Sequence, residues 1–131
     1  MLRELLVAGV CTAGLIAPVW ADEVRFARDV VPIFKSNCVM CHLPGDTSAV
    51  GGLALHPKGG LANLVGVAST QSPLLRVAPG KPADSYLYRK LIGSHAEVGG
   101  SGERMPFGDL QLSETQIDVI RRWIEAGAKA N

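Results

Sequence analysis

Apolar residues between positions 22 and 131 recur at intervals of three and four residues in four separate stretches. This spacing places side chains on one face of a helix. It predicts helices at about residues 28–37, 61–67, 85–92 and 114–126. No stretch alternates apolar and polar residues long enough to predict a strand. The pattern therefore predicts an all-α domain of about four helices, joined by long loops rich in glycine and proline.

The first and last of these helices carry clear end signals. Asp29 is a residue type that caps helix N-termini, and Pro32 then falls in the first turn, where it removes no internal hydrogen bond. Ser113 and Gln116 have the spacing of a capping box, in which the cap residue and the third helical residue bond each other. Gly127 marks the end of the last helix. We expect the first helix to lead directly into the residues that follow position 37.

The stretches between the helices are dense in glycine and proline, especially residues 43–60, 72–82 and 93–108. These residue types interrupt regular structure. Asp84 or Ser85 is a candidate cap for the third helix, and Gly93 is its stop. We therefore expect three loops, the first of which wraps around another part of the domain.

The first 21 residues have the organisation of a secretory signal peptide. A short basic start precedes an almost wholly apolar segment at residues 5–19, and Ala21 supplies the small residue expected before a cleavage site. We expect cleavage after Ala21 and export of residues 22–131, as one domain, to a bacterial periplasm. An uncleaved membrane anchor is the alternative, although Pro18 interrupts the segment and a bilayer-spanning helix needs about 20 residues. Cys11 is interpreted as part of the apolar segment.

The most informative run is Cys38-Val39-Met40-Cys41-His42. Two cysteines three positions apart, followed at once by histidine, match the attachment signature of c-type haem. The thiols add to the haem vinyl groups, and the adjacent imidazole is close enough to bind the iron. A structural zinc site and a thioredoxin-like thiol pair are the alternatives. Zinc requires four ligands, and the remaining candidates, His56 and His95, lie far apart in the sequence, so the run favours one covalent haem c.

Composition adds further limits. Lysine and arginine number 13 against 12 acidic residues, a net charge of +1 without the basic patch that favours nucleic acid. Removal of residues 1–21 leaves two of the three cysteines, both in the haem signature, so no pair remains for a structural disulfide. A domain this small buries a modest core, and we expect the polypeptide without its cofactor to be poorly folded. Scattered lysines are interpreted as solvated surface, with steering of a partner as the alternative: Lys35, Lys58, Lys81 and Lys90.

These features together resemble the small monohaem cytochromes c of class I. In that class a helix enters Cys-x-x-Cys-His, a late loop contains Met-Pro, and a capped helix ends the domain. The resemblance implies a small cytochrome c-like fold of about four helices wrapped around one covalent haem. It also implies that Phe34 packs the first helix on the last, with Trp123 as its partner. More narrowly, several segments are similar to the planctomycete-type cytochrome c domains: Asp29–Phe34, Cys38–His42, Arg76–Gly80, Ser85–Tyr88, Arg104–Pro106 and Trp123–Ala128.

The same resemblance implies a role for each residue of the site. Cys38 and Cys41 hold the haem, His42 is the proximal ligand of the iron, and Met105 is the distal ligand. Residue type alone suggests donors to the haem propionates. Arg76 is the first choice, ahead of Lys81, Tyr86 and Arg104.

Met105 is the residue on which the function depends. Met1 leaves with the signal peptide and Met40 lies inside the haem signature, whereas Met105 lies far enough downstream to reach the opposite face of the haem. A methionine that only fills the core is the alternative. His95 competes for the distal position, and His56 is a weaker competitor.

With both axial positions occupied, the iron has no site for a substrate. The expected function is therefore transfer of single electrons between a redox protein donor and acceptor, without catalysis. A thioether ligand raises the reduction potential. A gas sensor or a peroxidase-like enzyme with a displaceable Met105 is the alternative, and a third interpretation is a cytochrome subunit of a larger periplasmic oxidoreductase. We expect a monomer or a subunit of a complex, no nucleic acid, and membrane association only if the signal helix is retained.

Overall fold

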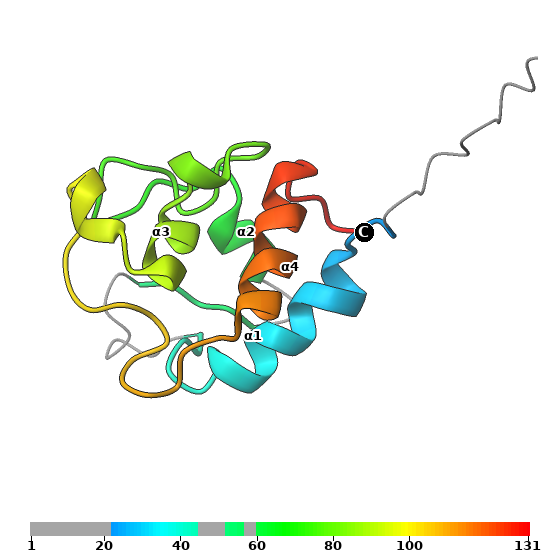
Figure 1. Ribbon diagram of the computed structural model, residues 1–131. Coiled ribbons are helices and arrows are strands. Elements are labelled where there is room, and N and C mark those ends of the chain that lie inside the picture. The colour runs from blue at the N-terminus through cyan, green and yellow to red at the C-terminus, as the bar shows by residue number, and fades with distance from the viewer. Residues whose placement is uncertain (1–21, 45–51, 57–59) are drawn as a thin grey trace, which may run out of the picture.

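The structure is a computed structural model that describes residues 22–44, 52–56 and 60–131. Within these ranges the chain forms four α-helices and no strand, and extended residues pair only as isolated bridges. The predicted all-α architecture is confirmed, and Figure 1 shows α1 running obliquely beside α4. The predicted signal peptide and part of the first predicted loop lie outside the described residues. The elements in chain order are η1 (Phe26–Val30, a π-helix), α1 (Val31–Asn37), α2 (Gly60–Leu64), η2 (Pro82–Asp84, a 3₁₀-helix), α3 (Tyr86–Ile92), η3 (His95–Val98, a 3₁₀-helix) and α4 (Glu114–Glu125).

The first helical segment begins at Phe26, before the predicted start, and Asp29 is not its cap. The opening π-turn is closed by the Val31 N–H, which donates to the Phe26 carbonyl, and the α-helix then continues with Pro32 in its first turn. Asp29 lies inside the segment, where its carboxylate accepts from the Arg25 N–H at 2.7 Å. The prediction of Asp29 as the cap is therefore wrong, because helical geometry already starts three residues earlier.

Of the two middle helices, α2 is shorter than predicted, whereas α3 spans the predicted residues after Ser85. α2 stops where Val65 pairs with Val77 as an isolated parallel bridge. α3 ends at Gly93 as predicted, and the φ of +78° at this glycine is a left-handed conformation that residues with a Cβ rarely adopt. Ser85 precedes α3, but its buried hydroxyl accepts from the Ala78 N–H at 2.9 Å instead of capping the helix.

The last helix has the ends that the sequence predicts. The Ser113 hydroxyl accepts from the Gln116 N–H at 3.3 Å, and the Gln116 side chain accepts from the Ser113 N–H at 3.0 Å. The capping box is thus confirmed. Gly127 follows the helix with a φ of +98°.

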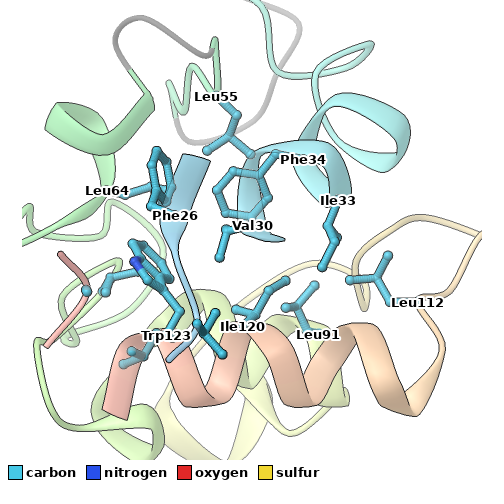
Figure 2. Packing of buried hydrophobic residues seen from close by; sticks show 14 residues of the cluster. Phe26, Val30, Ile33, Phe34, Leu55, Leu64, Leu91, Leu112, Ile120 and Trp123 are labelled. Atoms are coloured by element: carbon cyan, nitrogen blue, oxygen red, sulfur yellow. The ribbon is translucent and has the colours of Figure 1, made fainter. Parts of the chain in front are cut away.

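Apolar side chains from η1, α1 and α4 meet in one core (Figure 2). The Phe26 ring lies 6.2 Å from the Phe34 ring, edge to face, and 5.2 Å from the Trp123 ring. Phe34 and Trp123 therefore belong to one aromatic cluster, and Phe26, which the helical pattern left out, joins them. The aliphatic part of this core includes Val30, Ile33, Leu55, Leu64, Leu91, Leu112, Ile120 and Ile124.

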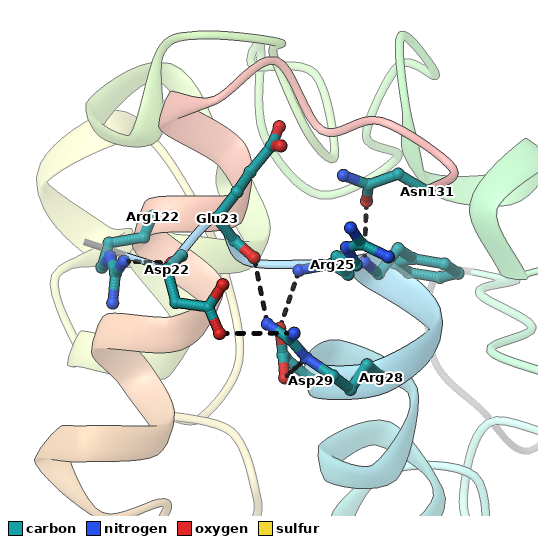
Figure 3. Close-up of polar contacts among 8 residues, drawn as sticks. Asp22, Glu23, Arg25, Arg28, Asp29, Arg122 and Asn131 are labelled. Atoms are coloured by element: carbon teal, nitrogen blue, oxygen red, sulfur yellow. Dashed lines mark hydrogen bonds and ion pairs between the residues drawn. The ribbon is translucent and has the colours of Figure 1, made fainter. Parts of the chain in front are cut away.

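The two ends of the described chain meet beside η1 (Figure 3). The Asn131 side-chain carbonyl accepts from the Phe26 N–H at 2.9 Å, and its backbone carbonyl accepts from the Ala27 N–H at 3.1 Å. Arg122 of α4 donates to the Asp22 carbonyl at 2.9 Å. These bonds fix the start of the first helix against the last one. In the part of the chain described, no helix combines the length and apolar character needed to span a bilayer.

Candidate functional site

The residues of the cysteine signature form one tight turn at the end of α1. The Cys38 N–H donates to the Phe34 carbonyl at 2.9 Å, as the last bond of the helix. The N–H groups of Cys41 and His42 both donate to the Cys38 carbonyl at 3.1 Å. The helix therefore delivers two thiols and an imidazole within a single turn, as the sequence predicts.

His42 is held by its side chain and its backbone against the segment 52–56. Its Nδ1 lies 3.0 Å from the Leu53 carbonyl, and its own carbonyl accepts from the Leu55 N–H at 2.9 Å. Because a carbonyl only accepts, Nδ1 is the donor in this bond, and in the neutral ring Nε2 is then the nitrogen with a free lone pair. Metal-binding histidines have this arrangement, in which a hydrogen bond at one ring nitrogen fixes the tautomer and orients the other toward the metal.

The two thiols differ in environment. Cys38 is half-buried and Cys41 is exposed. Burial raises the pKa of the Cys38 thiol to about 11, with a smaller contribution from the neighbouring Cys41. Thiols that attack disulfides have lowered pKa values, because the thiolate is the nucleophile. The environment of Cys38 thus runs against the thioredoxin-like interpretation.

The zinc interpretation would need further ligands near this turn. Among the residues that the structure describes, no three histidine, cysteine, aspartate or glutamate side chains converge as they would around a metal ion. His95, one of the two histidines considered as additional ligands, is buried on η3 with its Nε2 2.6 Å from the Gly102 carbonyl. That bond commits the ring to the loop after η3, so His95 serves this loop and does not add to the cysteine turn.

Met105 lies in the loop between η3 and α4, half-buried and followed by the buried Pro106. Its N–H donates to the Lys90 carbonyl at 3.1 Å, and the neighbouring Arg104 donates through Nε to the Leu91 carbonyl at 2.8 Å. Both acceptors are in the last turn of α3, so the loop is fixed at that point. In Figure 1 this loop, yellow to orange, hangs at the same lower end of the molecule as the cyan turn that follows α1.

Arg76 is connected through Asn63 to the segment that bonds His42. Its guanidinium donates to the Asn63 carbonyl at 2.8 Å, and the Asn63 amide donates to the Ala54 carbonyl at 3.4 Å. Ala54 lies between the two residues that bond His42. Arg76 therefore helps to hold the segment 52–56, a contact that sequence reasoning did not anticipate.

Lys90 is the residue that sequence reasoning placed wrongly. It was assigned to the solvated surface, but only 7% of it is exposed. Its Nζ donates to the carbonyls of Ser101 and Glu103 at 2.6 and 2.7 Å. Its position four residues after the buried Tyr86 on α3 is the signal that marks it as inward-facing.

Large apolar side chains are exposed on both of the turns that carry the site. Met40 is 88% exposed and Leu43 43%, and on the Met105 loop Phe107 is 68% exposed and Leu110 74%.

No protein-family model, curated protein or solved structure matches this chain.

Proposed function

We propose that this chain is an exported c-type cytochrome that carries single electrons. Cys38 and Cys41 would hold one haem c by thioether bonds, and His42 and Met105 would bind its iron from opposite faces. The observation that carries the proposal is the bond from His42 Nδ1 to the Leu53 carbonyl. It leaves Nε2 as the ligating atom of an imidazole that sits directly after the second thiol.

The residues at the cysteine turn fit the proposed cofactor. The backbone N–H groups of Cys41 and His42 both bond the Cys38 carbonyl, so the two cysteines and the histidine share one tight turn. A hydrogen bond to the distant ring nitrogen increases the basicity of a ligating histidine and holds its plane. The raised pKa of the Cys38 thiol argues against disulfide exchange at the same motif.

Met105 decides between a carrier and an enzyme. A bound haem iron supplies reversible one-electron chemistry, and its axial ligands adjust the potential. A thioether at the sixth position favours the ferrous state and leaves no position for a substrate. The Met105 backbone N–H and the Arg104 side chain both donate to carbonyls at the end of α3, and these bonds hold the loop in place. The chain's own contribution is thus ligand identity and geometry.

Arg76 is our proposed donor to a haem propionate. Its guanidinium is already oriented by the bond to the Asn63 carbonyl, and a planar guanidinium carries five N–H donors in a fixed geometry. The same group therefore links the segment that holds His42 to the carboxylate it would bind.

The proposed partners are a redox protein donor and a redox protein acceptor in the periplasm. Electron-transfer encounters bury little surface and are short-lived. The exposed apolar residues Leu43, Phe107 and Leu110 offer such a surface on the two turns that carry the site.

The test is optical and uses the full chain expressed with c-type haem maturation machinery. The ferric protein should keep its pigment after acid and organic extraction and show the weak far-red sulfur-to-iron band. Met105→Ala should abolish the band and keep the covalent haem, whereas Met40→Ala, which removes a thioether that is exposed, should leave both unchanged.

Three results would overturn parts of the proposal. Survival of the far-red band in Met105→Ala refutes the ligand assignment. A high-spin wild type that binds carbon monoxide readily replaces the carrier by a gas sensor or peroxidase-like enzyme. Complete extraction of the pigment from the wild type refutes covalent attachment through Cys38 and Cys41.

A further inference from the structure

We infer that Lys90 is a positioning residue that holds Met105 in place for the iron. It does so as a clamp, by bonding residues at the start and at the end of the short segment 101–105. The inference rests on the proposed function, since it assigns a second residue to the Met105 ligand. Lys90 touches neither of the two thiols nor His42 by any bond in the described chain.

The side chain of Lys90 fixes the first half of that segment. Its buried Nζ donates to the Ser101 carbonyl at 2.6 Å and to the Glu103 carbonyl at 2.7 Å. Distances this short are typical of charge-assisted bonds from an ammonium group. The Tyr86 ring lies beside the ammonium, with its centroid 5.7 Å from Nζ.

The backbone of the same lysine fixes the end of the segment, at Met105. The Lys90 carbonyl accepts from the Met105 N–H at 3.1 Å. One residue of α3 therefore bonds positions 101, 103 and 105, every second residue of the segment that ends at the proposed ligand.

Two further buried side chains secure the start of the segment. The Tyr86 hydroxyl donates to the Ser101 carbonyl at 3.2 Å, and His95 Nε2 donates to the Gly102 carbonyl at 2.6 Å. His95 Nδ1 is buried without a hydrogen-bond partner among the described residues. The bonds from Tyr86 and His95 thus add to those of Lys90 at residues 101 and 102.

The chemistry of Lys90 favours positioning over simple packing. Removing an ammonium group from water is costly, and burial lowers the pKa of Lys90 accordingly. A methionine or leucine would fill the same space without that cost, and replacing buried charges by apolar residues is often stabilising. A cation at this position is therefore explained by its bonds to the carbonyl groups of a glycine-rich loop, which has few side chains that could hold it in place.

The experiment compares two clamp variants with a matched control in the holoprotein. Lys90→Met removes both side-chain bonds and keeps the length, and Tyr86→Phe removes only the hydroxyl. Ser85→Ala is the control. Ser85 lies at the start of α3, and its substitution deletes buried hydrogen bonds to Ala78 and Lys81 without affecting any bond to residues 99–105. The readouts are the far-red sulfur-to-iron band, the affinity of the ferric protein for added imidazole, and the melting temperature.

Imidazole binds iron only when the methionine leaves, so its affinity reports how firmly Met105 is held. We expect Lys90→Met to bind imidazole about tenfold more tightly than Ser85→Ala, which corresponds to about 1.4 kcal/mol. Tyr86→Phe should show a smaller increase, of about threefold, for the loss of two long neutral bonds between its hydroxyl and the Ser101 backbone.

The inference is overturned if both clamp variants bind imidazole as Ser85→Ala does while melting lower than the wild type, because the contacts would then serve stability alone. If Lys90→Met does not fold, Tyr86→Phe decides by the same comparison. A wild-type holoprotein that lacks the sulfur-to-iron band overturns the ligand assignment itself, which separates failure of the proposed function from failure of the clamp.

Discussion

Gly100 lies where the Met105 loop approaches α3 and η3 most closely, and adding a single methyl group there tests that packing. A Cβ at this position would lie 2.5 Å from Tyr86 Cε2 and 2.6 Å from the His95 carbonyl oxygen. The first distance is about 0.9 Å shorter than ordinary van der Waals contact at 3.4 Å. The second obstacle is backbone, which side-chain rotation cannot relieve, so Gly100→Ala forces the loop away from the helix.

The expected cost follows from the kind of overlap. Inserting one methyl group into a closely packed site costs typically 1–3 kcal/mol, and with a backbone obstacle we expect about 3 kcal/mol. For a domain of this size that corresponds to a fall of about 12 °C in melting temperature, at about 4 °C per kcal/mol. Since the displaced loop carries Met105, the far-red band should weaken in the same variant.

Gly108→Ala is the matched control on the same loop. Gly108 has a φ of +71° and no atom within 4 Å of an added Cβ, so its substitution tests backbone strain without overlap. We expect a cost of about 1 kcal/mol, a fall of about 4 °C, and an unchanged far-red band. Thermal melts of the three holoproteins by far-ultraviolet circular dichroism provide the comparison. The reasoning fails if Gly100→Ala melts with the wild type, or if Gly108→Ala is the more damaging substitution.

Three further predictions concern the framework of the domain. Phe26→Ala removes the ring at the centre of the aromatic cluster and should cost about 3–5 kcal/mol in denaturant unfolding; a cost under about 1 kcal/mol would mean that the cluster does not tie the two helices together. Ser113→Ala opens the capping box with Gln116 and should cost about 1 kcal/mol, with no change in the haem spectrum. Hydrogen bonding from Arg28 holds the pKa of Asp29 below its usual value. A lowered carboxylate pKa stabilises the fold at neutral pH and loses that effect as the pH falls through the folded-state pKa, so the difference in stability between wild type and Asp29→Asn should shrink below about pH 4; a pH-independent difference contradicts this.

The last helix could be predicted from sequence because all its signals are local. Ser113, Gln116 and Gly127 act within one or two turns of the helix ends, and the structure has them as expected. The first helix was predicted less well, because the bonds that extend it to Phe26 come from Asn131, at the other end of the chain. Neither propensity nor periodicity contains that information.

The candidate site divides in the same way. The cysteine turn stands out in the sequence because haem attachment, the proposed chemistry, needs those residue types at that spacing. The partner of His42 was not identified, because a backbone carbonyl such as that of Leu53 has no residue signature. Lys90 was assigned to the surface by residue type, which holds for most lysines. Its acceptors are carbonyls 11 and 13 residues away, and only the folded loop brings them within reach.

Asp22 and Asn131 both lie at one corner of the domain, where they bond α4 and η1. This placement affects how the domain can be joined to another protein. Phe26 begins the helical segment that ends at Cys38, so at 1.5 Å per residue about 18 Å of helix separates this corner from the first thiol. A tether, a fused neighbour or an affinity tag joined directly before Asp22 or directly after Asn131 would leave from the same side of the domain. The cysteine turn would stay accessible to a partner protein whichever of these two residues was extended.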